Sequence, residues 1–257
     1  MKKNILIYSD KGVSPACVKE TVRSLRRALD SKLINIKLAK GDFMKKSSWE
    51  KETALFVMPG GRSSPYYKQL SDAGNQKIVD YVKSGGNYLG ICAGGYYGCQ
   101  YTEFAKGYEE LEICCDGALN FFPNSAVGPV YGAEEFEYSS QKGARAVPII
   151  WLEDQSIHTV YYNGGCYFTN AEKYKNTKIL ATLADMKNNP ATIIECQVEK
   201  GKAILMGIHL EYSYQALKPE EQKNKSFYQT LKINEEKRQQ LFETLLLRYS
   251  IAAKLDG

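Results

Sequence analysis

The feature that most constrains this chain is a cysteine held between glycines directly after a short apolar run. Residues 87–91 (NYLGI) predict a buried strand, and residues 90–94 (GICAG) follow the pattern G-x-C-x-G. This is the cysteine counterpart of the G-x-S-x-G turn, which presents a nucleophile between a strand and a helix. Small neighbours let the backbone close around the thiol, and the positive end of the following helix favours the thiolate. The match alone fits a tight structural turn equally well, so the case for Cys92 as a nucleophile depends on its partners.

Apolar runs alternate with helical patterns through the first hundred residues. Residues 4–8, 33–38 and 54–58 predict strands, and Ser14 with Pro15 supplies a helix cap followed by a first helical residue. This alternation predicts a parallel sheet with helices on both faces. Such sheets bind their ligands at the carboxyl ends of the strands, where both glycine-rich breaks of this region fall.

The rest of the chain continues the β pattern less regularly. We predict short antiparallel strands added to the core, then further strands, and a final amphipathic helix at about residues 234–255. No repeat, low-complexity tract or linker divides the sequence, so residues 1–257 are expected to form a single domain. The expected added strands are residues 109–115, 127–131, 136–138, 146–152 and 158–162, and the later strands are residues 178–183, 191–197 and 202–208.

One of the two histidines is placed to serve the cysteine. His209 follows the strand-like residues 203–208 and would emerge at the carboxyl end of a strand. Glu211 lies two residues later, so in an extended segment it points the same way and could orient His209 as the base. His158 has no carboxylate at that spacing and is expected to be a strand or surface histidine. An H-x-E pair alone favours a structural role, but together with the cysteine turn it favours a catalytic constellation.

Backbone groups near the cysteine could hold an oxyanion. Residues 59–61 (PGG) end the predicted strand at residues 54–58, and in a parallel sheet their loop can lie beside the cysteine turn. Because glycine leaves its N–H accessible, Gly60 and Gly61 are candidate donors, together with the N–H of Ala93.

Four side chains near these breaks are candidates for substrate binding. Arg62 could bind a substrate carboxylate bidentately, although a surface arginine fits equally well. Tyr66, Tyr96 and Tyr97 belong to Tyr-Tyr pairs beside glycine or proline breaks, and they could stack on a flat ligand. Ordinary packing is the alternative for these rings. The turn at residues 163–165 (NGG) could form part of the pocket rim.

Charge and cysteine content argue against several classes of protein. The net charge of +5 is spread along the chain without a dense basic run, so nucleic acid is not an expected partner. The seven cysteines match no disulfide framework and include no CxxC pair, so we expect free thiols, no structural metal and no cofactor. No apolar stretch is as long as a membrane helix, and the N-terminal apolar run is too short for a signal peptide. The sequence therefore predicts a cytoplasmic protein without membrane contact.

Together these motifs resemble the class I glutamine amidotransferase-like superfamily. More narrowly, FVMPGGRSSPYY, GNYLGICAGGYYG and YYNGGCYF make the chain similar to the N-terminal domain of eukaryotic-type biotin-protein ligases and its stand-alone bacterial relatives. The similarity runs over about residues 1–215 and implies a three-layer, flavodoxin-like α/β fold with a mostly parallel sheet. The residues to which it implies triad and oxyanion roles are Cys92, His209, Glu211, Gly61 and Ala93.

Three departures from related proteins bear on function. Glutamine amidotransferases usually follow the pattern C-x-G-x-Q, and Tyr96 stands where that glutamine would, so glutamine is not the expected substrate. The GRGRxxR-like biotin-binding segment of ligases is missing, so biotinylation by this chain alone is not expected. Ala93 stands where protease- or chaperone-like members of the superfamily carry a histidine, which counts against that branch.

Two functions stay open. The first is a cysteine-dependent amidase or amidotransferase-like hydrolase that acts on a small amide or acyl substrate. The second is a non-catalytic ligand-binding or regulatory module, related to the ligase N-terminal domain but without ligase activity of its own. Both imply a small-molecule substrate or ligand, and the second admits a protein partner.

Overall fold

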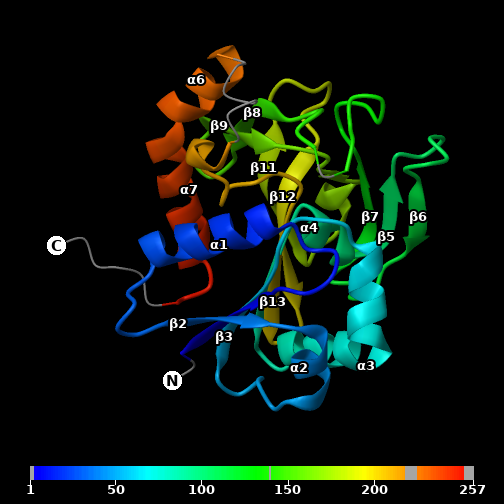
Figure 1. The fold of residues 1–257 in the computed structure, drawn as a ribbon, viewed down its shortest axis with the longest axis vertical. Helices are drawn as coiled ribbons and strands as arrows, with labels where there is room; N and C mark the ends of the chain where they lie inside the picture. The colour runs from blue at the N-terminus through cyan, green and yellow to red at the C-terminus, as the bar shows by residue number, and fades with distance from the viewer. Residues whose placement is uncertain (1–2, 139, 218–224, 252–257) are drawn as a thin grey trace.

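A nine-stranded sheet crosses the centre of the protein (Figure 1). The computed structural model describes residues 3–138, 140–217 and 225–251. The strands of this sheet are β1 (Asn4–Tyr8), β2 (Asn35–Ala39), β3 (Thr53–Met58), β4 (Asn87–Ile91), β8 (Arg145–Trp151), β9 (Ser156–Tyr162), β11 (Thr177–Leu183), β12 (Ala191–Val198) and β13 (Gly201–Met206). Their order is β2-β1-β3-β4-β13-β12-β11-β8-β9. Neighbours are parallel from β2 to β13 and antiparallel from β13 to β9.

Helices cover both faces of this sheet. The helices are α1 (Pro15–Ala28), α2 (Gly41–Lys46), α3 (Ser64–Lys83), α4 (Ala93–Tyr97), α6 (Lys225–Ile233) and α7 (Glu235–Leu247), with 3₁₀ turns η1 (Ala171–Lys173) and η2 (Tyr214–Ala216). Alternate residues of a strand face opposite sides, so Ile5 and Ile7 of β1 join the core under α1 and α7, which lie side by side (Figure 1). Leu6 and Tyr8 join the core under α2 and α3. The predicted three-layer α/β fold with a mostly parallel sheet is therefore confirmed.

A second, smaller sheet differs from the antiparallel additions that we predicted. Its strands are β5 (Cys99–Phe104), β6 (Ile113–Asp116), β7 (Phe122–Gly128) and β10 (Tyr167–Phe168), in the order β10-β7-β5-β6. Two of its pairings, β5 with β6 and β7 with β10, are antiparallel as predicted for the added strands, whereas β5 pairs with β7 in parallel. The predicted strands at residues 146–152 and 158–162 do form antiparallel strands, as β8 and β9 of the large sheet.

Three of the predicted strands in this region also need correction. The strand expected at residues 109–115 begins only at Ile113, and the one expected at residues 127–131 ends at Gly128. Pro129 follows it and has no N–H to continue the ladder. The strand expected at residues 136–138 is a loop. The rings of Phe136 and Tyr138 in this loop pack on Phe104, and this packing accounts for the apolar pattern.

The C-terminal helix is shorter than the predicted 234–255. Asn234 stands at the N-cap, and α7 ends at Leu247, where the chain turns and Ser250 adopts a positive φ of 53°. Residues 252–257 lie outside the part of the chain that the structure describes. In that part, no helix is long and apolar enough to span a bilayer. The single-domain organisation stays a prediction.

Burial along α7 gives a direct test of its place in the core. Phe242 is fully buried, whereas Leu247 on the same helix is 60% exposed. We expect Phe242→Ala to lower the free energy of unfolding by about 3–5 kcal/mol, because a large ring leaves a cavity. Leu247→Ala should change it by only about 0.5 kcal/mol. Urea denaturation followed by circular dichroism measures both, and equal losses would contradict this placement of α7.

Candidate active site

The order of three strands brings three loops together. In the sheet, β4 lies between β3 and β13, and all three are parallel, so their carboxyl ends meet at one edge. Cys92 directly follows β4, Gly60 follows β3 by two residues, and His209 follows β13 by three. The segments that follow β3, β4 and β13 are far apart in the sequence but therefore meet at this edge of the sheet.

Cys92 sits on a tight turn that only small neighbours permit. Its backbone has φ 51° and ψ −107°, a region that non-glycine residues rarely adopt. A Cβ atom on Gly94 would lie 2.0 Å from the Met58 carbonyl oxygen, and one on Gly90 would lie 2.3 Å from the carbonyl oxygen of Gly94. The G-x-C-x-G pattern is thus required sterically. The helix after the turn, α4, forms as expected but has only five residues, so its dipole is weaker than that of a long helix.

His209 and Glu211 form a buried pair. His209 Nδ1 lies 2.8 Å from Glu211 Oε1, and the two residues are 3% and 0% exposed. The segment is held by its backbone: His209 N donates to the Tyr161 carbonyl at 3.0 Å, and the Ser24 hydroxyl donates to the Glu211 carbonyl at 2.7 Å. Arg238 of α7 donates to the Leu210 carbonyl. The expected orientation of Glu211 toward His209 is therefore present.

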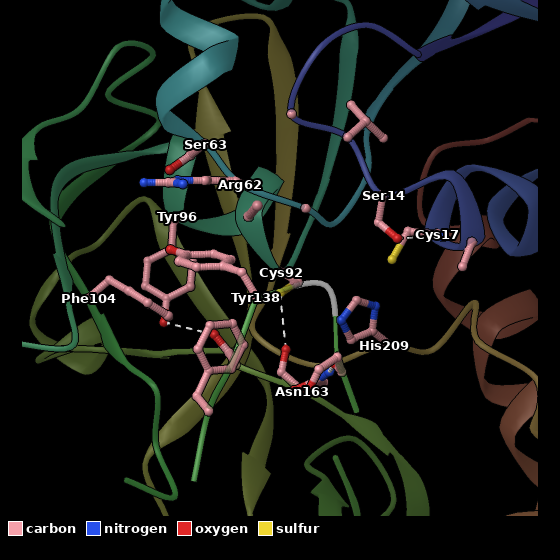
Figure 2. A pocket seen from close by; sticks show the side chains of 18 of the residues that line it. Ser14, Cys17, Arg62, Ser63, Cys92, Tyr96, Phe104, Tyr138, Asn163 and His209 are labelled. Atoms are coloured by element: carbon pink, nitrogen blue, oxygen red, sulfur yellow. Dashed lines mark hydrogen bonds between the residues drawn. The ribbon is translucent and has the colours of Figure 1, made fainter. Parts of the chain in front are cut away.

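The thiol of Cys92 lies within reach of this pair. Burial alone would lower the pKa of His209, but the charges of Glu211 and Cys92 and hydrogen bonds to both side chains raise that pKa well above its ordinary value. Because Nδ1 faces Glu211, the other ring nitrogen is left for Cys92. The thiol also donates to the Asn163 carbonyl at 3.7 Å (Figure 2). The sulfur, imidazole and carboxylate thus stand in the order that a thiol triad needs.

Because Gly60 has no side chain, Cys17, Cys92 and His209 can pack closely around it. A Cβ atom there would lie 2.8 Å from His209 Cε1, 3.1 Å from Cys17 Sγ and 3.5 Å from Cys92 Cβ. Gly60 therefore packs under the triad instead of lining the cavity beside it. Ala93 is the first residue of α4, so its N–H has no acceptor within that helix. No hydrogen bond from the Gly61 N–H is found within the described ranges.

Cys17 is a second thiol at the site that sequence analysis did not select. Its sulfur lies within 4.8 Å of ligand atoms of His209 and Glu211. Burial raises the pKa of the Cys17 thiol to about 11, so it stays protonated at neutral pH. Cys17, His209 and Glu211 form a cluster that could hold a metal ion, although His209 Nδ1 already bonds to Glu211 Oε1. Its position in the sequence could have indicated this location, because Cys17 lies one helical turn after the Ser14 cap, at the same edge of the sheet.

A cavity of about 670 Å³ opens above Cys92 (Figure 2). Arg62 and Tyr96 line it, whereas Tyr66 and Tyr97 do not. The Tyr66 hydroxyl donates to the Pro59 carbonyl at 3.1 Å and the Tyr97 hydroxyl to Asn75 Oδ1 at 2.7 Å, which fixes both rings in the core. Six aromatic rings form part of the cavity wall. Its rings are those of Tyr96, Phe104, Phe136, Tyr138, Tyr161 and Tyr212.

Polar side chains also line this cavity, among them those of Arg62, Glu137, Gln141 and Asn163. The Arg62 guanidinium lies over the Tyr138 ring, 4.8 Å from its centroid. Asn163 and Gly164 line the cavity, as expected for the turn at residues 163–165. His158, the other histidine, lies on β9 within 2.8 Å of the Ser156 hydroxyl and does not line the cavity. It is the strand histidine that the sequence predicts.

Comparisons with known proteins agree with this fold. Residues 3–256 match the protein family described as "Biotin-protein ligase, N terminal". An uncharacterized protein of Chlamydia muridarum is 38% identical over 211 residues, which cover 82% of this chain and 81% of the relative. The biotin–protein ligase of Schizosaccharomyces pombe is 37% identical over 214 residues, and the match covers 82% of this chain but only 33% of the ligase. A glutamine amidotransferase structure from Thermotoga maritima aligns over 97% of this chain and 98% of its own, with a TM-score of 0.59 and 15% identity.

The His209–Glu211 pair predicts a pH dependence. Glu211→Gln removes the charge that offsets burial, so the pKa of His209 should fall, as followed by NMR of the imidazole nitrogens. The folded pKa of wild-type His209 lies above its unfolded value of about 6.5, so this stabilisation is full below that pH. It is lost as the pH rises through the folded pKa. Thermal melts should show this loss in wild type and not in E211Q, while the His158 signals stay unchanged in both. An unshifted His209 in E211Q would contradict the pairing.

Proposed function

The chain belongs to the biotin-protein ligase N-terminal family and has a class I glutamine amidotransferase-like fold; on that premise we propose that it is a cysteine-dependent hydrolase or transferase for a small amide or acyl substrate. The observation that carries the proposal is the triad geometry. Cys92 stands on a strained turn, the buried His209 lies within its reach, and Glu211 holds the imidazole at 2.8 Å. Cys92 and His209 line a cavity that can admit a ligand.

The reaction follows from the positions of these groups. The Cys92 sulfur attacks the substrate carbonyl, and the N–H groups of Gly61 and Ala93 stabilise the oxyanion. His209 donates its proton to the leaving amine, which departs and leaves a thioester on the sulfur. Water or an acceptor amine then attacks the thioester carbonyl and gives a proton to His209, the C–S bond breaks, and the acid or the new amide leaves as the proton returns to the sulfur. Glu211 keeps the imidazole in the required orientation throughout.

Cavity size and lining support a substrate larger than glutamine. Free glutamine would fill only a small part of about 670 Å³, and the rigid phenol of Tyr96 occupies the place of the glutamine in the C-x-G-x-Q pattern. Aromatic walls suit a flat or apolar acyl group, and Arg62 at the cavity could pair with a carboxylate on it. Because a relative is named biotin–protein ligase, biotinyl amides are the first candidates to test. The chain spans about a third of that ligase's length, so ligase activity is not proposed for it.

We also propose that the protein works in the cytoplasm. All seven cysteines are free thiols, which supports a reducing compartment such as the cytoplasm. A non-catalytic module that binds a small ligand beside a partner ligase is the second candidate, because its relative carries this region within a longer ligase chain. The hydrolase requires a reactive thiol at Cys92, whereas the binding module does not.

Thiol reactivity tests the triad. Iodoacetamide should alkylate Cys92 in the wild type, and His209→Gln should slow this by about 100-fold, because a positioned base is typically worth that much or more. His158→Gln is the matched control, since it removes the other histidine, and it should leave the rate unchanged. Mass spectrometry of the Cys92 peptide gives the rate. Equal alkylation of wild type and H209Q would refute the triad.

Turnover separates the enzyme from the binding module. Biotinyl amides and other ring-bearing acyl amides should be hydrolysed by the wild type and not by Cys92→Ser, with glutamine as a poor substrate. Mass spectrometry of intact protein should detect the acyl-enzyme on Cys92. If a compound raises the melting temperature of both wild type and C92S while neither releases an amine from it, the binding module is favoured.

A further inference from the structure

Cys17 stands beside the triad without a role in the proposed reaction. It lies on the first turn of α1, is buried, and lines the same cavity as Cys92 and His209 (Figure 2). A Cβ atom on Gly60 would lie 3.1 Å from Cys17 Sγ and 2.8 Å from His209 Cε1. The fold thus brings a second thiol, from α1, close to the imidazole that follows β13.

Cys17, His209 and Glu211 together offer a donor set for one metal ion. One ligand atom of each residue, a sulfur, a ring nitrogen and a carboxylate oxygen, lies within 4.8 Å of the other two. The ligands of a tetrahedral zinc ion are about 3.3–3.6 Å apart, because their bonds to it are about 2.0–2.3 Å long. The 2.8 Å between His209 Nδ1 and Glu211 Oε1 lies below this range and 4.8 Å lies above it. Side-chain shifts of about 1 Å would therefore bring all three ligands to the spacing that zinc needs.

Glu211 also has a buried oxygen that lacks a partner. The residue is fully buried, and its Oε1 bonds to His209. Its other carboxylate oxygen, Oε2, has no hydrogen-bond partner among the described residues. Burying such an oxygen without a partner costs free energy, and a cation bound to the carboxylate would offset that cost. The unpartnered oxygen therefore points to a cationic ligand independently of the spacing of the cluster.

The chemistry of the donor set favours zinc. Thiolate, imidazole and carboxylate are the ligand types that zinc binds in proteins, whereas Mg²⁺ and Ca²⁺ take oxygen ligands. A thiolate and a carboxylate carry two negative charges, so Zn²⁺ would make the buried cluster neutral. Cys17 and His209 line the cavity, which gives the ion a path from solvent. As the ion binds, the proton of the Cys17 thiol leaves to solvent.

We propose that Cys17, His209 and Glu211 bind one Zn²⁺ ion and that this ion inhibits the triad. The ion is neither a structural metal nor a cofactor of the proposed reaction, because it occupies the base. If it binds Nε2 of His209, it separates the imidazole from Cys92. If it binds Nδ1, the ring proton stays on Nε2, which then cannot accept a proton from the thiol. The inhibition rests on the proposed function, whereas the binding itself does not.

Isothermal titration calorimetry of the reduced protein with Zn²⁺ tests the binding. We expect one ion per wild-type chain. Cys17→Ser should lower the affinity by at least about 100-fold, because loss of even a partner behind a metal ligand costs about 10–100-fold. Cys114→Ser is the matched control, since Cys114 is a free thiol on β6 outside the cluster, and it should bind like the wild type. Equal Zn²⁺ affinity of C17S and wild type, or no binding by the wild type, would overturn the proposal.

Cobalt spectroscopy identifies the thiol ligand and uses a second variant in case C17S does not fold. A thiolate bound to Co²⁺ gives a charge-transfer band in the near ultraviolet, so the wild type and C114S should show this band when Co²⁺ is added. Cys17→Ala should lack the band, whereas Cys92→Ser should keep it, because Cys92 is not one of the three ligands. A band that disappears in C92S and persists in C17A would place the metal on the nucleophile and refute the site.

Alkylation of Cys92 reports the inhibition. Saturating Zn²⁺ should slow the reaction of the wild type with iodoacetamide to the rate of H209Q, and a chelator should restore it. The same Zn²⁺ concentration should leave the rate of C17S unchanged, and equal slowing of C17S would contradict inhibition through this site. If Zn²⁺ binds through Cys17 but Cys92 shows no reactivity that depends on His209, the proposed function fails and the metal site stands. If that reactivity is present but Zn²⁺ neither binds nor slows it, the metal site fails and the proposed function stands.

Discussion

The site depends on the close approach of the Gly94 backbone to the end of β3. A side chain at Gly94 would begin 2.0 Å from the Met58 carbonyl oxygen, and one at Gly95 would begin 2.5 Å from the carbonyl oxygen of Met206 in β13. The turn is thus wedged between the two strands that flank β4. Such packing can hold Cys92 at φ 51°, a conformation that an isolated chain would relax. The same sheet order places the loops of Gly60 and His209 on either side of the thiol.

Burying His209 and Glu211 beside that thiol removes them from water at a cost in free energy, and hydrogen bonds from the surrounding helices reduce this cost. A buried ion pair pays a desolvation penalty that only good geometry and additional hydrogen bonds offset. The His209–Glu211 pair receives such bonds on its backbone, from Ser24 of α1 and from Arg238 of α7. The two helices that cover this face of the sheet therefore also build the site. α1 accordingly buries two polar side chains, Glu20 and Ser24, that bond to the backbone of this segment.

The central part of this structure could be predicted because its signals are local. Apolar runs mark β1, β3 and β4, the glycine spacing marks the turn at Cys92, and two-residue spacing aligns His209 with Glu211. Cys17 was missed because the sequence of α1 also offers an apolar face, which ends in the buried Leu25 and Leu29. The structure shows why this part of α1 is buried: Cys17 lies next to His209 and Glu211. The pairing of β5 with β7 was missed for a similar reason: it joins distant segments, and no short sequence pattern encodes a parallel partner.

Tyr96 shapes the cavity wall beside Cys92. The phenol donates to the Gly164 carbonyl at 3.3 Å and packs edge-on against Phe104, with the ring centroids 5.8 Å apart. A Cβ atom on Gly128 would come within 2.1 Å of its hydroxyl oxygen, so two loops are shaped around this ring. A module released from catalysis would have no need to bury a histidine–glutamate pair, and apolar replacements there would often be neutral or stabilising. The buried His209–Glu211 pair therefore supports the proposed hydrolase over the proposed binding module.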